Sequence, residues 1–80
     1  MIGVEKVRHE VGLAIFQERV AQRYTRQDVS QAIGCTAKTV ENIERGVTKI
    51  NLEMYLEICS FFGKGISYFL PSDWKQIRKG

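Results

Sequence analysis

Residues 25–46 read as two short helices joined by a tight turn. Thr25 and Asp28 have the spacing of a capping pair, which predicts that a first helix starts between them. Gly34 ends this helix, because glycine adopts the left-handed conformation of a helix end without steric cost. A second helix is predicted over residues 37–45. Two short helices around a glycine turn are typical of a helix-turn-helix, and the alternative is an ordinary helical hairpin.

The second helix of this pair separates its side chains onto two faces. At about 100° per residue, Val40 and Ile43 point to one side. Ser30, on the preceding helix, is small enough for the two helices to cross closely. The opposite face carries Ala37, Lys38, Glu41, Asn42 and Arg45. In a helix-turn-helix this face lies across another macromolecule, whereas in an ordinary hairpin it is a solvated surface.

The composition narrows the class of protein. A chain of 80 residues, 44% of them hydrophobic, is large enough for one small domain with a core. The formal charge of +3 and the isoelectric point near 9.1 suit an anionic partner such as nucleic acid. No apolar run is long enough to span a bilayer, and the N-terminus lacks a signal-peptide pattern. We therefore expect a cytoplasmic protein with no membrane partner.

The sequence offers no pattern of catalytic or metal-binding residues. It has no nucleophile beside a base, no phosphate loop, and one histidine, His9, which we interpret as a surface residue. Cys35 and Cys59 lie within apolar patterns and form no CxxC motif, so we expect buried, reduced side chains and no zinc site or disulfide. We expect no enzyme activity, no cofactor, no metal and no small-molecule ligand.

The segment before the helix pair has the pattern of a longer helix over residues 11–23. Its apolar residues form two stripes on nearly opposite sides, the first of which includes Val11 and Ile15. The second stripe consists of Leu13, Phe16 and Val20. In so small a protein, a helix that is apolar on two sides needs a second cover, such as a terminal segment or another copy of the chain. Residues 1–10 are expected to form an N-terminal extension joined to this helix.

Two further helices are predicted in the last third of the chain. The first begins after the N-cap Asn51. Its buried side is predicted to consist of Leu52, Tyr55, Leu56, Ile58, Cys59 and Phe62. The second covers residues 66–70 and is stopped by Pro71. Its core-facing residues are predicted to be Ile66, Phe69 and Leu70. With a tail over residues 71–80, the sequence predicts an all-α fold of five helices.

Several segments match a known family in their order and spacing. They are Arg19 and the stretches TRQDVSQAIG, TAKTVENIERG, NLEMYLEICSFFG and ISYFL. Over residues 11–70 the chain thereby resembles the lambda-repressor/Cro-type (XRE-like) helix-turn-helix family. The resemblance implies a compact five-helix DNA-binding domain that acts as a symmetric dimer on operator DNA. It also implies that Arg19 forms an ion pair with Glu44, which locks the first helix to the recognition helix.

The chain departs from this family at a few positions. Residues 23–24 are Arg-Tyr where the family usually has Gly-Leu, so the turn before the helix pair is expected to differ in shape. Arg26 stands where the family usually has glutamine. The family usually has charged residues at the positions of Leu13, Phe16 and Val20. With Trp74 and Ile77 of the tail, this stripe is predicted to cover either a homodimer interface or a folded-back terminus.

The resemblance places the helix over residues 37–45 in the major groove, with its N-terminal half nearest the bases. The residues expected to contact bases are Ala37, Lys38, Thr39 and Asn42. Among these, Lys38 suits guanine and Asn42 suits adenine. The methyl groups of Ala37 and Thr39 suit thymine or the groove wall. The residues expected to contact phosphates are Arg26, Gln27, Thr36, Arg45, Thr48 and Lys49. Glu41 would repel phosphates, and we expect the neighbouring cations Lys38 and Arg45 to neutralise it.

The function predicted from the sequence is that of a transcriptional regulator. It would bind double-stranded DNA sequence-specifically, as a homodimeric repressor on a palindromic operator. The alternative is a protein-interaction module, an antitoxin or anti-regulator that uses the same fold to bind a protein. The two differ in their response to salt, because phosphate contacts make DNA affinity fall steeply as salt rises.

Overall fold

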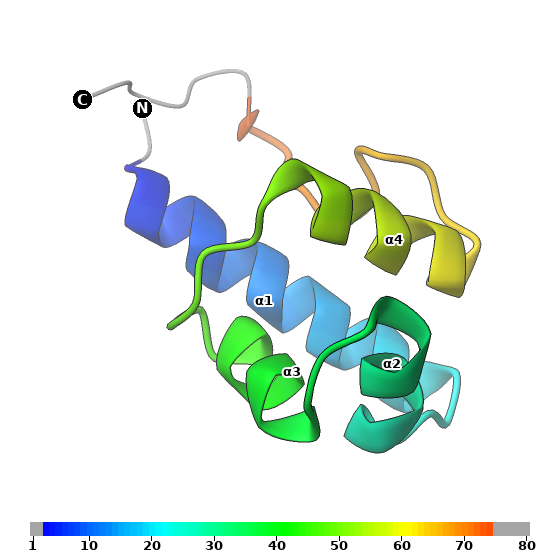
Figure 1. The fold of residues 1–80 in the computed structure, drawn as a ribbon. Helices are drawn as coiled ribbons and strands as arrows, with labels where there is room; N and C mark the ends of the chain where they lie inside the picture. Colours follow the sequence, from blue (N-terminus) through cyan, green and yellow to red (C-terminus); the bar gives the residue numbers. More distant parts are fainter. Residues whose placement is uncertain (1–2, 75–80) are drawn as a thin grey trace.

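The structure is a computed structural model that describes residues 3–74, and these residues form helices and turns without any strand (Figure 1). The helices are α1 (Val4–Ala21), α2 (Arg26–Ile33), α3 (Ala37–Glu44) and α4 (Leu52–Phe62). In Figure 1, α1 crosses the middle of the molecule, with α2 and α3 below it and α4 above it. The all-α class is confirmed, and so is the pair of short helices. Ile77, which was predicted to contribute to an interface, lies outside the described residues.

Local side chains determine where the short helices begin. The Thr25 hydroxyl accepts a hydrogen bond from the Asp28 N–H at 3.0 Å, and the Thr25 N–H donates to the Asp28 carboxylate at 2.8 Å, which completes a capping box. Thr36 caps α3 by accepting from the Thr39 N–H at 3.1 Å, and Asn51 caps α4. The helix ends agree as well, because Gly34 is left-handed with φ of 75°. The predicted boundaries of α2 are therefore confirmed.

Arg23 occupies the turn between α1 and α2 in a conformation that side chains rarely adopt. Its φ is 63°, and it is the only non-glycine residue with positive φ among those that the structure describes. The replacement of the family's usual Gly-Leu thus leaves a left-handed residue in this turn. Backbone hydrogen bonds close it, from the Arg23 N–H to the Val20 carbonyl at 3.0 Å and from the Tyr24 N–H to the Arg19 carbonyl at 3.0 Å.

One apolar core joins all four helices. The buried hydrophobic residues are Val11, Ile15, Val29, Ile33, Val40, Ile43, Ile58, Cys59, Phe62 and Phe69. Ser30 is also buried, as expected where α2 crosses α3 closely. Gly12 permits α1 to approach the end of α3, because a Cβ there would lie 2.4 Å from the Ile43 carbonyl oxygen. The longest helix is thus held directly against the backbone of α3.

The predicted fifth helix, residues 66–70, is wrong. This segment forms turns, with hydrogen bonds from the Tyr68 N–H to the Gly65 carbonyl at 3.1 Å and from the Leu70 N–H to the Ser67 carbonyl at 3.2 Å. These bonds span three residues, and the segment is too short, between Gly65 and Pro71, to build the four-residue repeat of an α-helix. Its apolar function is kept in part, because Phe69 is 1% exposed.

Three residues predicted to be buried are exposed. Leu52 is 67% exposed, Leu56 is 45% exposed and Ile66 is 56% exposed. The face of α4 that meets the core is centred on Ile58 and Phe62, and the two leucines lie a quarter turn or more away from it at 100° per residue. Ile66 is turned outward because its segment is not helical.

The second apolar stripe of α1 has no cover within the described chain. Leu13 is 53% exposed, Phe16 37% and Val20 52%, and Trp74, in the part of the tail that is described, is itself 39% exposed. The stripe is therefore a surface of the molecule as far as residues 3–74 are concerned. Within this range no helix is long and apolar enough to cross a bilayer.

Candidate nucleic-acid interface

Two faces of α3 differ sharply in exposure, because one packs on the core. Val40 and Ile43 are each 1% exposed and anchor the helix beneath α1 and α2. On the outer side, the side chains of Lys38 and Arg45 are 68% and 61% exposed. The helix is therefore fixed by its apolar side while its polar side stays open to a partner. The start of α2 lies beside it, since α2 and α3 pack closely together (Figure 1).

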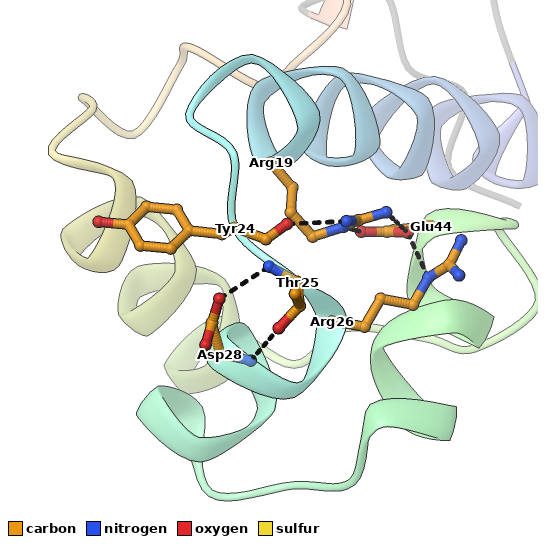
Figure 2. Close-up of polar contacts among 6 residues, drawn as sticks. All are labelled: Arg19, Tyr24, Thr25, Arg26, Asp28 and Glu44. Atoms are coloured by element: carbon orange, nitrogen blue, oxygen red, sulfur yellow. Dashed lines mark hydrogen bonds and ion pairs between the residues drawn. The ribbon is translucent and has the colours of Figure 1, made fainter.

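A buried carboxylate joins α1 to α3. Glu44 accepts from Arg19 Nε at 2.6 Å and from Arg19 Nη2 at 3.2 Å, which forms a two-pronged ion pair (Figure 2). Arg19 Nη1 donates to the Tyr24 carbonyl at 2.9 Å. The side chains of Glu44 and Arg19 are 2% and 10% exposed. The two residues that the family resemblance pairs are thus in direct contact. Such a pair holds geometry, and loss of one partner costs about 3–5 kcal/mol.

Arg26, for which only a phosphate contact was expected, contacts this carboxylate. Its Nε donates to Glu44 Oε1 at 2.9 Å, and its side chain is 39% exposed (Figure 2). Arg26 is the first residue of α2, so the start of that helix is tied to the end of α3. Sequence reasoning missed this contact because 18 residues separate the partners and no local pattern relates them.

The residues predicted to contact bases differ in their accessibility. Lys38 is exposed, whereas Ala37, Thr39 and Asn42 are half-buried. The Thr39 hydroxyl lies 3.0 Å from the hydroxyl of Thr36, so one predicted base contact is held by one predicted phosphate contact. The structure brings all four residues onto one helix, and it leaves Lys38 the most available.

Glu41 is neutralised as the sequence predicted. Its Oε2 lies 3.5 Å from Lys38 Nζ and 3.8 Å from Arg45 Nη1. These are exposed pairs at helical spacing, each of which contributes only about 0.3–0.5 kcal/mol. Lys38 and Arg45 therefore remain available to a partner of higher charge density, while Glu41 no longer presents a bare negative charge.

The remaining predicted phosphate contacts lie on both sides of α3. Gln27 is exposed in the first turn of α2, and Lys49 is exposed in the connector that follows α3. Thr48, also in the connector, is half-buried, and its N–H donates to the Asn42 carbonyl at 3.4 Å. The connector is thus attached to α3 through the backbone of Asn42.

The cysteines add no reactive group to this surface. Cys35 and Cys59 are both free thiols, and Cys59 is buried in the core. Burial raises the pKa of the Cys35 thiol, with a smaller contribution from Glu57, so the thiol stays protonated at neutral pH. Among the described residues no cluster of His, Cys, Asp and Glu side chains has the arrangement of a metal site.

Comparisons with known proteins give the fold and the family. A family profile described as helix-turn-helix matches residues 15–69, which is more than half of the chain. No curated protein sequence matches this chain. The crystal structure of the clp gene regulator ClgR from C. glutamicum is similar, with a TM-score of 0.74 and 19% identity over 79% of this chain and 82% of that one.

A second solved structure, of the hypothetical transcription factor NHTF from Neisseria, has a TM-score of 0.76 and 18% identity over 89% of this chain and 84% of that one. At these identities the likeness shows the fold, while the family profile covers the helix pair, the buried ion pair and α4. The chain belongs to the lambda-repressor/Cro-type (XRE-like) family of helix-turn-helix DNA-binding proteins.

Proposed function

We propose that this protein is a transcriptional repressor that binds a specific double-stranded operator through α3. The observation that carries the proposal is the division of α3 into an anchored apolar side and an open polar side. Cations stand on both flanks of that open side, the half-buried Arg26 before it and the exposed Lys49 after it. A helix of this width fits the major groove, and flanking cations fit the phosphates on either edge.

Each predicted contact then has a distinct chemical part. Lys38 donates to guanine O6 and N7, and Asn42 pairs with adenine, each discriminating by about 1–3 kcal/mol. The methyl groups of Ala37 and Thr39 meet thymine or the groove wall. The phosphate contacts are Arg26, Gln27, Thr36, Arg45, Thr48 and Lys49. These position the helix without reading sequence, and they make binding dependent on salt. No catalytic group takes part.

We infer that two copies of the chain act together on the operator. A single α3 reads only a few base pairs, so a symmetric pair of copies on a palindromic operator gives the affinity expected of a repressor. The uncovered stripe of Leu13, Phe16 and Val20 is the surface offered for pairing, with Trp74 and Ile77 as further candidate residues. The two similar solved structures, named as a gene regulator and a transcription factor, support a regulatory role.

The experiment that tests the function is a selection of duplexes from a randomised pool at physiological salt. The expected result is a palindrome with half-sites about one helical turn, roughly 34–36 Å, apart. Lys38→Ala should then relax the preference at one position of each half-site, while Lys6→Ala, which removes an exposed lysine from α1, should leave the selected sequence unchanged. A pool that stays random would reject sequence-specific binding.

A protein-interaction module is the second candidate, and the exposed stripe on α1 favours it. In that case the partner would cover the stripe, and the salt dependence of binding would be weak. Each subunit has three cationic phosphate contacts, Arg26, Arg45 and Lys49. A dimer with all of them bound predicts instead that affinity falls about 10³-fold between 50 and 200 mM salt. A flat salt profile with a protein captured through Leu13 would decide for the second candidate.

A further inference from the structure

The Glu44 carboxylate is shared between two arginines that do different things with their donors. It accepts three N–H groups: Arg19 Nε at 2.6 Å, Arg19 Nη2 at 3.2 Å and Arg26 Nε at 2.9 Å. Arg19 spends its remaining nitrogen on the Tyr24 carbonyl and is almost fully buried. Each nitrogen of Arg19 therefore already has a partner within the protein.

Arg26 is left half-used by these contacts. Only its Nε is bonded, and its two terminal nitrogens make no hydrogen bond to residues 3–74. Figure 2 shows both nitrogens projecting away from Glu44. With its side chain 39% exposed, Arg26 presents the outer edge of the guanidinium to solvent from a fixed root. A guanidinium held at Nε can still bind a phosphate oxyanion with its terminal N–H groups.

The charges of the cluster are also unbalanced. Two guanidinium groups share one carboxylate, so the cluster carries a net charge of about +1, and the excess lies on Arg26, the exposed partner. An oxyanion placed at the terminal nitrogens of Arg26 would balance that charge. Both the free donors and the free charge point to the same edge of the same side chain.

We propose that Glu44 is a positioning residue for binding of a nucleic-acid phosphate: it fixes Arg26 at Nε so that the two terminal nitrogens form a phosphodiester site at the start of α2. The ligand class rests on the proposed function, since the phosphate is that of the operator backbone. The site differs from a flexible surface cation because its side chain is already ordered before DNA arrives, so that less conformational entropy is lost on binding.

The first test exchanges Arg26 for residues that keep only part of its chemistry. In Arg26→Lys the charge remains, but the donors of lysine lie on one nitrogen, which cannot reproduce the separate positions of Nε at Glu44 and of the terminal nitrogens at a phosphate. Operator affinity should fall about 10-fold in Arg26→Lys and in Arg26→Gln alike, as expected for the loss of a charged hydrogen bond. The matched control is Arg23→Gln, which removes an exposed arginine from the adjoining turn and should change affinity less than 3-fold. Arg26→Lys binding as tightly as wild type would overturn the proposal.

The second test uses the sign of an effect at Glu44. Glu44 is acidic, so if it acted only through charge, Glu44→Gln would reduce repulsion of DNA and tighten binding. A positioning role predicts the opposite, a weaker complex, and predicts that the weakening disappears when Arg26 is already glutamine. Tighter binding by a Glu44→Gln protein that circular dichroism shows to be folded would reject the positioning role. If this variant does not fold, the Arg26 series still decides.

A readout without DNA separates this inference from the proposed function. In the free wild-type protein, the Nε–H resonance of Arg26 should be resolved and protected from solvent exchange, and titration with inorganic phosphate should shift the side-chain resonances of Arg26 but not those of Arg23. If no duplex is bound while phosphate gives this shift, the site stands and the proposed function fails. If operator DNA is bound but neither DNA nor phosphate moves the Arg26 resonances, the function stands and the site is wrong.

Discussion

Arg23 lies in a turn whose left-handed backbone conformation would suit glycine better. A left-handed backbone conformation destabilises a residue that has a Cβ by roughly 1–2 kcal/mol. Glycine avoids this strain, but part of the gain is offset because glycine loses more conformational entropy on folding. Arg23 bears this cost at the junction of α1 and α2, where it is exposed. Its side chain therefore contributes little packing that would justify the strain.

Replacing this residue by glycine is expected to stabilise the protein. Arg23→Gly should raise the free energy of unfolding by about 0.5–1 kcal/mol, because it removes the Cβ from a left-handed position. Denaturant titration followed by circular dichroism measures the change. Arg23→Ala is the matched control: it shortens the side chain but keeps the Cβ, so it should give no gain. An equal gain from alanine would show that the arginine side chain, and not the backbone, is the source of strain.

The turn over residues 66–69 is held to α1 by one carboxylate, although it is not a helix. Glu18 accepts from the Tyr68 hydroxyl at 2.5 Å and from Gln22 Nε2 at 2.6 Å, and Lys64 Nζ lies 4.0 Å away. These contacts, the Tyr68 hydrogen bond first, hold the pKa of Glu18 below its ordinary value of 4.5. The charged carboxylate therefore favours the folded state, in which its donors are assembled.

This contact predicts a dependence of stability on pH. A carboxyl whose folded pKa is depressed contributes stability that is complete above its unfolded pKa and is lost as pH falls through the folded value. Wild type should thus lose its advantage over Tyr68→Phe as pH falls below 4.5, the ordinary value, while the difference stays constant from pH 5 to 7. Urea titrations at several pH values measure it.

Tyr24→Phe is the control for this series. The Tyr24 hydroxyl makes no hydrogen bond to the described residues, and its ring, which packs on Phe61 with centroids 4.7 Å apart, is kept by phenylalanine. Its stability curve should run parallel to that of wild type at all pH values. A parallel curve for Tyr68→Phe as well would mean that the hydroxyl does not perturb Glu18.

Among residues 3–74, two groups of exposed apolar side chains offer competing sites for assembly. One is the α1 stripe of Leu13, Phe16 and Val20, and the other includes Leu52 and Leu56 on the outer side of α4. Phe16 also lies 5.4 Å from the Arg19 guanidinium, measured to the ring centroid, so it shields the buried ion pair from one side. The α1 stripe therefore lies next to the Arg19–Glu44 ion pair, which joins α1 to α3.

The proposed homodimer can be tested by charge on each surface. Leu13→Glu/Val20→Glu places two carboxylates on the α1 stripe, and these repel across a symmetric interface, so we expect a monomer in sedimentation velocity and loss of binding to a full palindrome. The matched control is Leu52→Glu/Leu56→Glu, which should stay dimeric. Dissociation of the α4 variant alone would move the interface to that surface, and a monomeric wild type at high concentration would remove the dimer.

The sequence by itself determined the helix pair, its boundaries and the family. Thr25, Asp28, Thr36 and Asn51 cap their helices through bonds that span three residues, and such contacts are legible in a linear pattern. The neutralisation of Glu41 was predicted for the same reason, because its partners lie three and four residues away. The predicted base and phosphate contacts remain predictions.

Only the tertiary structure decided which apolar residues are covered and which charges meet. Leu52, Leu56 and Ile66 have the composition of core residues, but their exposure depends on how α4 and the following turn pack, which no local spacing encodes. Arg26 meets Glu44 because α2 and α3 pack against each other, and a contact across 18 residues depends on that packing. Local hydrogen bonds join residues that are close in the sequence, so the sequence predicts them. Long-range contacts form only when the chain folds around its core.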